Sequence, residues 1–168
     1  MVGDALKEAQ RVFDIEAQAI KGLSTHLDGD FTQSIDAVLT SNGKVIVCGM
    51  GKSGLIGQKI SATLSSTGTA SFFMHPAEAI HGDLGMISPD EVFVAISYSG
   101  ETEELIQLIP FLQDNGNTII AMTGKPQSTL AKNASYHLNV HVDEEACPLR
   151  LAPTASTSAT LAMGDALA

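Results

Sequence analysis

Two short segments rich in hydroxyl side chains and glycine are the strongest candidates for binding a ligand. In the first, Ser97, Ser99 and Thr102 surround a glycine just before a helix-length segment. The second, Gly49–Gly54, carries Ser53 and also precedes a predicted helix. Hydroxyls and free amides at a helix start suit a phosphate, although each segment alone could be an ordinary cap or a tight turn. Because both should meet at one sheet edge, we favour a shared anion site.

The glycine spacing of residues 49–54 also occurs in other phosphate-binding loops, which the neighbouring residues disfavour. The dinucleotide fingerprint Gly-x-Gly-x-x-Gly requires an acidic residue at the end of the second strand, to hold a ribose. That predicted strand ends in Phe72–Pro76, which contains no acid. A Walker A loop requires a glycine five residues before Gly51, where the sequence has Ile46. An NAD-dependent dehydrogenase therefore remains an outside alternative.

Histidines and carboxylates provide the groups that could move protons. His75 and His81 lie in one predicted loop, where a histidine can titrate, donate to a sugar hydroxyl or bind a metal. Asp143–Glu145 follows the last predicted strand, and such a run is most often a solvated acidic turn. His137 and His141 alternate along that strand, and we interpret both as structural.

A sheet is needed to position these side chains. The β-rich runs are Lys44–Cys48, Ala70–Met74, Val92–Ile96, Thr118–Met122 and Tyr136–Val142, and the helix-length segments include Gly54–Ser66, Glu101–Gln113 and Gln127–Ala134. Continuous apolar strands alternating with helices are typical of a parallel sheet covered on both faces. We predict an α/β fold, a three-layer α/β/α sandwich with a five-stranded parallel sheet of flavodoxin-like type. Ligands bind beyond the carboxyl ends of such strands.

The sandwich core should occupy residues 41–168 of a single domain, 1–168, after N-terminal helices over residues 1–40. The first helix carries apolar residues on more than one face, which favours a homo-oligomer. A last helix over Thr154–Ala168 stops without a capping glycine, so we expect a longer natural protein.

Composition excludes several classes of protein. The 168 residues carry a net charge of −10 with 44% hydrophobic and 17% charged residues, which argues against disorder. Without a basic cluster, nucleic acid is not an expected partner. No apolar run is long enough for a membrane helix, and the first ten residues lack signal-peptide features, so we expect a cytoplasmic protein without membrane contact. Cys48 and Cys147 lack metal-site spacing, and Cys48 should belong to the core.

Four segments, in this order, resemble a known family. They are GMGKSG (residues 49–54), FFMHPAEAIHGDLGM (72–86), SYSGETEE (97–104) and EEACPLRLAPTASTSATLAMGDALA (144–168). Together they are similar to sugar isomerase (SIS) domains, and more narrowly to arabinose-5-phosphate isomerases of the 3-deoxy-manno-octulosonate (Kdo) pathway of lipopolysaccharide biosynthesis. The second and fourth segments are the specific ones.

The resemblance implies an aldose–ketose isomerase that interconverts D-arabinose 5-phosphate and D-ribulose 5-phosphate through a cis-enediol. It implies no required cofactor, zinc at His75 as an inhibitor, and a homo-oligomer, a tetramer. The alternatives are a non-catalytic SIS module that senses a sugar phosphate, and a SIS isomerase for another sugar phosphate.

The resemblance also implies roles for individual residues. Positions that match phosphate-holding hydroxyls are Ser53, Ser97, Ser99 and Thr102; those that match catalytic positions are Lys52, Glu104, Glu145 and His81; those that match substrate contacts are Gly68, Thr69, His75 and His81. We expect Glu145 to be the enediol base, with its pKa raised by burial beside Asp143 and Glu144, and Lys52 to stabilise the enediolate. Glu104 is the alternative base.

The sequence departs from the family pattern in three places. Tyr98 stands where the family often has Asn, and Arg150 replaces a smaller residue. The family also carries a catalytic histidine in a Ser-His-Pro-Gly-Gly stretch beyond the last helix, followed by a pair of CBS domains, and the printed sequence contains neither. This chain is therefore expected to bind the sugar phosphate and to be weakly active.

Overall fold

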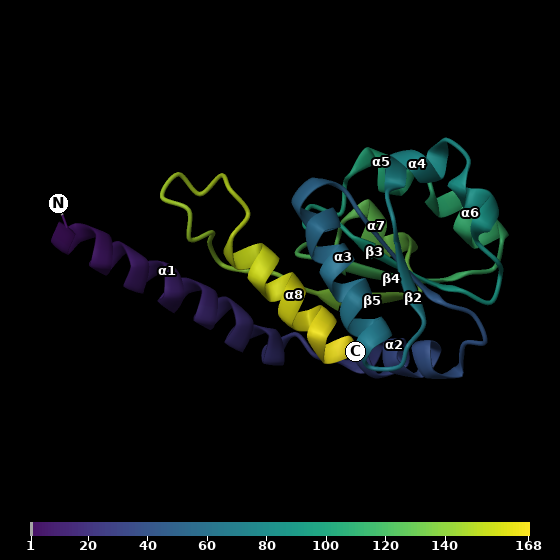
Figure 1. The fold of residues 1–168 in the computed structure, drawn as a ribbon, viewed down its shortest axis with the longest axis horizontal. Coiled ribbons are helices and arrows are strands. Elements are labelled where there is room, and N and C mark those ends of the chain that lie inside the picture. The colour runs from purple at the N-terminus through teal and green to yellow at the C-terminus, as the bar shows by residue number, and fades with distance from the viewer. Residues whose placement is uncertain (1) are drawn as a thin grey trace.

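The computed structural model describes residues 2–168, and within them five parallel strands form one sheet (Figure 1). The strands are β1 (Val45–Gly49), β2 (Ser71–Met74), β3 (Val92–Ile96), β4 (Thr118–Thr123) and β5 (Tyr136–Asn139), in the spatial order β2-β1-β3-β4-β5. In the pairing of β1 with β3, Ile46 lies opposite Phe93. The predicted parallel five-stranded sheet is confirmed.

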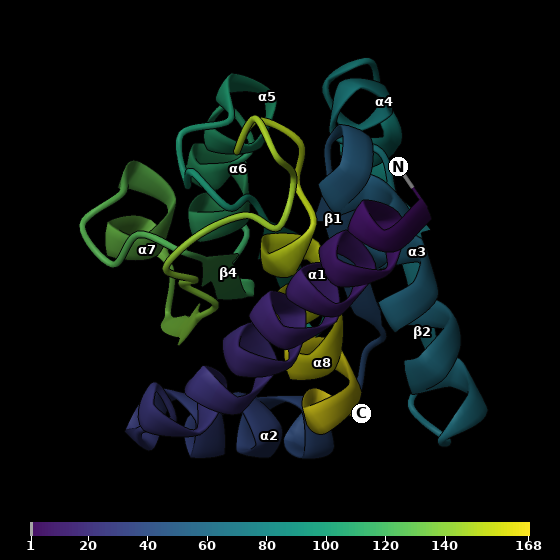
Figure 2. The ribbon, with the colours of Figure 1, turned by 90° about the vertical axis from the view of Figure 1, so that its left-hand side faces the viewer.

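Helices cover both faces of the sheet, as Figures 1 and 2 show. On one face lie α1 (Val2–Gly22), α2 (Gly29–Thr40), α3 (Gly51–Ser66) and α8 (Ala155–Leu167); on the other lie α4 (Pro76–Ile80), α5 (Glu103–Ile106), α6 (Ile109–Asp114) and α7 (Thr129–Asn133). Short 3-10 turns, Leu23–Thr25 and Asp83–Met86, connect some of them. Because side chains alternate along a strand, Val45 and Val47 belong to the first core and Ile46 and Cys48 to the second. The predicted three-layer sandwich is confirmed.

The helix predicted over Glu101–Gln113 is wrong in extent, because the chain forms two short helices there, α5 and α6. Pro110 explains the break: it has no N–H to donate, and its ring conflicts with the carbonyl four residues earlier. In the structure Pro110 occupies the first turn of α6, where the missing donor costs little. The serine segment is therefore followed by a helix of 4 residues, α5, instead of the longer helix that was predicted.

The last strand is also shorter than predicted, ending at Asn139 rather than Val142. The side-chain oxygen of Asn139 accepts a hydrogen bond from His141 N at 3.0 Å, which turns the chain out of the sheet. Within β5, His137 Nε2 lies 2.9 Å from Thr123 Oγ1, and burial lowers the pKa of His137. These contacts agree with a structural role for His137.

The helix α1 reaches beyond the body of the molecule (Figure 1). Its inner side packs along α8, where Glu16 Oε2 accepts a hydrogen bond from Ser158 Oγ at 2.7 Å. Leu6, Phe13 and Ile20 lie on its exposed side and keep 69%, 70% and 43% of their surface in solvent. None of the helices within residues 2–168 combines the length and apolarity needed to span a bilayer.

Cys48 lies at the end of β1 and is fully buried, as its place in an apolar run predicted. Burial raises the pKa of its thiol to about 12, because the thiolate would lose its hydration there. Cys48 is therefore an inert member of the core.

Candidate functional site

The candidate site lies between β1 and β3, where the order of the strands in the sheet reverses. These two strands are neighbours, and Gly49 at the end of β1 pairs with Ile96 at the end of β3. The chain leaves β1 toward α3 on one face and leaves β3 toward α5 on the other face. The two connections diverge at the carboxyl edge, and such a crevice is the usual ligand site of an open α/β sheet.

The connection after β1 is built for close approach of the backbone. Gly51 has a φ of +57°, a backbone conformation that residues other than glycine rarely adopt. A Cβ at Gly54 would lie 2.6 Å from the carbonyl oxygen of Gly49, so the start of α3 can sit this close to β1 only with glycine there. Met50, the residue before α3, provides no side-chain cap. The first-turn amides of this 16-residue helix, beside Ser53, are thus free to bind an anion.

The connection after β3 gathers three hydroxyls. The buried Ser97 Oγ lies 2.7 Å from Thr102 Oγ1 and 3.4 Å from Ser99 Oγ, and it accepts a hydrogen bond from Gly100 N at 3.1 Å. Gly100 has a φ of +65°, and a Cβ there would overlap Ser128 Oγ. Glycine at this position lets the loop fold over its own hydroxyls and hold them together.

The predicted histidines lie along the same edge. His75 directly follows β2, which is the neighbour of β1, and its Nδ1 accepts a hydrogen bond from Ala77 N at 3.3 Å. This bond caps α4 and leaves the Nε2 atom for another partner. His81 ends α4, and both histidines are exposed. The helix α4 contacts α5, which carries the half-buried Glu104 (Figure 1).

Two predicted substrate contacts, Gly68 and Thr69, lie elsewhere. They follow α3, at the amino edge of the sheet and just before β2. At 1.5 Å per residue the 16 residues of α3 span about 24 Å, so these residues are remote from Ser53 within one chain. A single copy does not bring them to the hydroxyl cluster.

Metal binding at His75 stays a prediction. Among residues 2–168, no group of three or more histidine, cysteine, aspartate or glutamate side chains is arranged to hold a metal ion.

Glu145 occupies a different environment from the one predicted. Its Oε2 accepts hydrogen bonds from Thr154 N at 2.7 Å, Thr154 Oγ1 at 2.9 Å and Ser156 N at 3.2 Å. Burial alone would raise the pKa, but the bonds from Ser156 and Thr154 outweigh it and hold the pKa of Glu145 below its ordinary value. The predicted raised pKa is wrong.

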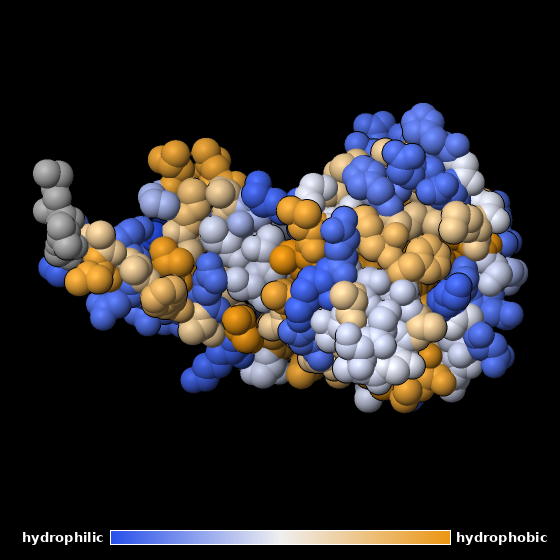
Figure 3. Space-filling model, in the orientation of Figure 1, coloured by the Kyte–Doolittle hydropathy of each residue, from blue (hydrophilic) through white to orange (hydrophobic). Residues whose placement is uncertain are grey.

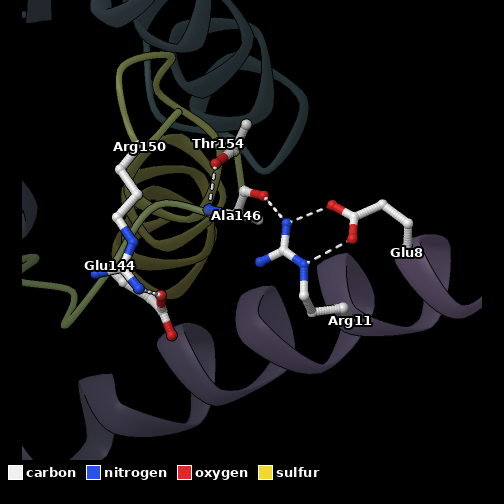
Figure 4. A network of polar contacts seen from close by, with 6 residues as sticks. All are labelled: Glu8, Arg11, Glu144, Ala146, Arg150 and Thr154. Atoms are coloured by element: carbon white, nitrogen blue, oxygen red, sulfur yellow. Dashed lines mark hydrogen bonds and ion pairs between the residues drawn. The ribbon is translucent and has the colours of Figure 1, made fainter. Parts of the chain in front are cut away.

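The neighbouring carboxylates do not crowd Glu145, which explains this result. Asp143 is fully exposed, and Glu144 forms an ion pair with Arg150 at 3.0 Å (Figure 4). Instead of like charges, Glu145 meets two backbone amides and a hydroxyl, and these donors stabilise the ionised form.

Contacts with α1 hold the loop that follows Glu145 (Figure 4). Arg11 bonds Glu8 on its own helix and donates to the carbonyl oxygen of Ala146 at 2.5 Å. The amide of Ala146 in turn donates to Thr154 Oγ1 at 2.8 Å. A continuous set of hydrogen bonds therefore runs from α1 to the start of α8.

Ser156 and Thr157, in the first turn of α8, were not among the predicted site residues. With Ser53 and Tyr98 they line a small cavity of about 40 Å³, between α3 and the serine segment. Tyr98 Oη bonds both the amide and the carbonyl of Val142 at 3.2 Å, which ties the serine segment to the chain leading to Glu145. Hydroxyl residues at a predicted helix start, Thr154–Thr157, were the available signal.

Comparisons with known proteins found a family, curated relatives and a solved structure to which this chain is similar. Residues 38–168 match the family model of the SIS domain. The chain is 52% identical over 165 residues to an arabinose 5-phosphate isomerase KdsD of Pseudomonas aeruginosa, covering 98% of this chain and 51% of that protein. It is 54% identical over 154 residues to an arabinose 5-phosphate isomerase KpsF of Escherichia coli O6:H1, covering 91% of this chain and 47% of that protein.

A solved structure is similar over nearly the whole chain. An Escherichia coli CFT073 protein in complex with A5P has a TM-score of 0.93 and 38% identity, covering 98% of this chain and 88% of that one. The chain spans about half the length of the curated relatives it matches.

Proposed function

The chain belongs to the SIS domain family, and from this premise we propose that it interconverts D-arabinose 5-phosphate and D-ribulose 5-phosphate. The observation that carries the proposal is that the hydroxyl cluster, the start of α3, which lacks a side-chain cap, and the segment with the two histidines follow neighbouring strands at the carboxyl edge of the sheet. The names of the curated relatives, and the A5P bound by the similar solved structure, support this substrate class. The proposed role is a step of the Kdo branch of lipopolysaccharide biosynthesis.

The phosphate would bind at the carboxyl edge of β1 and β3. Ser97, Ser99 and Thr102 offer hydroxyls from one side, and Ser53 with the first amides of α3 offers donors from the other. Neutral donors and a helix start stabilise a phosphate dianion although the whole chain carries a charge of −10.

The proton transfer needs a base near the sugar carbons. Isomerisation removes a proton from C2 of the aldose and returns it to C1 through the enediol, while a donor stabilises the developing oxyanion. We assign the base to Glu104, which lies two residues beyond Thr102 on α5, a helix that contacts α4. Lys52, exposed in the first turn of α3, and His81 would stabilise the enediolate.

The test is solvent exchange during turnover. Ribulose 5-phosphate is incubated with the protein in D2O, and arabinose 5-phosphate carrying deuterium at C2 should form. Glu104→Gln should still bind substrate while the rate falls about 10²–10⁴-fold, the usual loss for a general base. Glu103→Gln is the matched control, because that neighbouring glutamate is exposed and accepts a hydrogen bond from Gln107, just after the end of α5. Binding without turnover by a version extended to the length of its relatives would indicate a sensing module, and absence of binding would refute both.

We propose that the protein acts as a homotetramer. The exposed apolar residues Leu6, Phe13 and Ile20 recur every seven positions on α1 and need a partner surface. Figure 3 shows apolar atoms on α1 and on the nearby loop tip, where Leu149 and Leu151 are 75% and 80% exposed. A second copy would also supply Gly68 and Thr69 to a site that a single chain does not complete.

No cofactor enters this proposal, and zinc is proposed only as an inhibitor at His75. Zinc added to the active protein should lower the exchange rate, and a chelator should restore it. We propose a cytoplasmic location, where a charged sugar phosphate made inside the cell would be retained, and fractionation of the source cells would test it.

A further inference from the structure

We propose that Glu145 is a positioning residue, which holds the first turn of α8 against the anion site and does not itself take the proton from the sugar. The proposal rests on the proposed function, since it assigns Glu145 a part in the same reaction. It reverses the assignment expected from sequence, and the contacts of one carboxylate oxygen carry it.

The carboxylate of Glu145 acts as the N-terminal cap of α8. An α-helix begins with amides that have no partner within the helix, and a side-chain acceptor just before it satisfies them. Thr154, the residue before α8, offers no side-chain cap of its own. Glu145, nine residues upstream, provides the cap instead. Its Oε2 accepts hydrogen bonds from the amides of Thr154 and Ser156 and from the Thr154 hydroxyl. A negative charge at this end also complements the helix dipole.

The same bonds close the loop between β5 and α8. Thr154 Oγ1 donates to Glu145 and accepts from the amide of Ala146, so residues 145, 146 and 154 are joined in one small ring of contacts. Arg11 holds the carbonyl of Ala146 from the side of α1 (Figure 4). The segment from residue 145 to residue 154 is thereby held at both of its ends.

The element held by this cap reaches the anion site. Ser156 and Thr157 of the first turn share a small cavity with Ser53, from the start of α3, and with Tyr98, from the serine segment. Glu145 thus influences the proposed phosphate site through α8 rather than by touching substrate.

The same contacts disfavour Glu145 as the base. A base alternates between its ionised and protonated forms in every turnover. Protonation would neutralise the charge that three donors stabilise, so every turnover would have to proceed against these hydrogen bonds. The lowered pKa of Glu145 agrees with a group that stays ionised.

Substitutions that keep or remove the acceptor separate the two roles. Glu145→Gln keeps an acceptor oxygen but cannot act as a base, whereas Glu145→Ala removes the cap. If Glu145 is a positioning residue, the Glu145→Gln variant should retain kcat/KM within about tenfold, and kcat/KM should still fall at low pH as in the unmodified protein. The Glu145→Ala variant should lose more kcat/KM than Glu145→Gln.

Thr154→Val tests the same contacts from the other partner. It removes one donor to Glu145, and the acceptor of the Ala146 amide, without changing the charge of Glu145. It should lower kcat/KM and add little further loss in the Glu145→Ala background, because the two residues act as one unit.

The opposite pattern would overturn the proposal. If Glu145→Gln lost about 10²–10⁴-fold and its acid limb disappeared, while Thr154→Val behaved as the unmodified protein, Glu145 would be the base.

Amide hydrogen exchange separates failure of this proposal from failure of the proposed function. Protection of the Thr154 and Ser156 amides should fall in Glu145→Ala and persist in Glu145→Gln, whether or not the protein isomerises arabinose 5-phosphate. Unchanged protection in Glu145→Ala would refute the cap, and so the proposal. Inactivity of a version extended to the length of its relatives would instead refute the function.

Discussion

At the scale of residues, the hydroxyl cluster is the centre of the proposed anion site. Ser99 is exposed at the mouth of this cluster, and its Oγ lies 3.4 Å from Ser97 Oγ and accepts the amide of Glu101 at 3.2 Å. Ser99→Asp should place a fixed negative charge where the phosphate binds and abolish sugar-phosphate binding, because two like charges this close repel strongly. Isothermal titration calorimetry with ribulose 5-phosphate measures this loss.

The control for this substitution is Ser88→Asp, at an exposed serine before β3 on the opposite edge of the sheet. It adds the same charge far from the crevice and should bind as the unmodified protein does. Equal binding by Ser99→Asp would remove the serine segment from the site.

Glu145 also predicts how stability depends on pH. Its pKa in the folded state lies below the ordinary value of 4.5, so the folded protein gains stability from ionised Glu145 above that pH. The gain is lost as the pH falls from about 4.5 through the lowered folded-state value, because the unfolded chain takes up the proton first. Thermal unfolding between pH 6 and pH 3 should therefore show a steeper acid loss for the unmodified protein than for Glu145→Gln. Parallel curves for the two proteins would contradict the strong hydrogen bonds to this carboxylate.

At the scale of elements, the packing of α3 on β1 sets the geometry of the first anion loop. A Cβ at Gly54 would lie 2.6 Å from the Gly49 carbonyl oxygen and 3.3 Å from Phe73, so neither backbone nor ring leaves room. Gly54→Ala should lower the free energy of unfolding by about 1–3 kcal/mol, the usual cost of overpacking, and should weaken phosphate binding as α3 shifts. Chemical denaturation with parallel calorimetry measures both effects.

The matched control is Gly22→Ala, at the end of α1, where a Cβ would meet nothing within 4 Å. Gly22 already has helical backbone angles, so alanine should leave stability unchanged or raise it by less than about 1 kcal/mol. A loss equal to that of Gly54→Ala would mean that the close approach of α3 to β1 is not the cause.

At the scale of the whole molecule, α1 carries the surface through which we propose that copies assemble. Phe13 is 70% exposed in the middle of the apolar side of α1 that includes Leu6 and Ile20. Phe13→Glu should disrupt the tetramer, because a charge buried between subunits without a partner costs more than the interface gains. Light scattering at micromolar concentration should report a smaller mass for this variant, with Gln18→Glu, an exposed polar position on another side of the same helix, keeping the original mass. A monomeric mass for the unmodified protein would refute the tetramer.

The sequence alone determined the layers of the fold and the place of the anion loops. Runs such as Val92–Ile96 are apolar throughout, which only a strand covered on both faces tolerates, and their alternation with helices dictates parallel strands. Once the strands are parallel, Gly49–Gly54 and Ser97–Thr102 must meet at one edge. The break at Pro110 was also readable from sequence, since a proline conflicts with the interior of a helix, and the predicted helix of residues 101–113 overlooked it.

Only the tertiary structure decided which donors surround Glu145 and how far Gly68 and Thr69 lie from the anion loops. The pKa of a carboxylate depends on the donors around it, and those of Glu145 come from residues nine and eleven positions away, brought back by a loop whose path no local pattern specifies. Likewise, Gly68 and Thr69 are near Ser53 in sequence but remote in space, because the straight helix α3 separates them. Local patterns report the conformation of a segment, whereas the contacts that assign a side chain its chemistry form between segments when the chain packs.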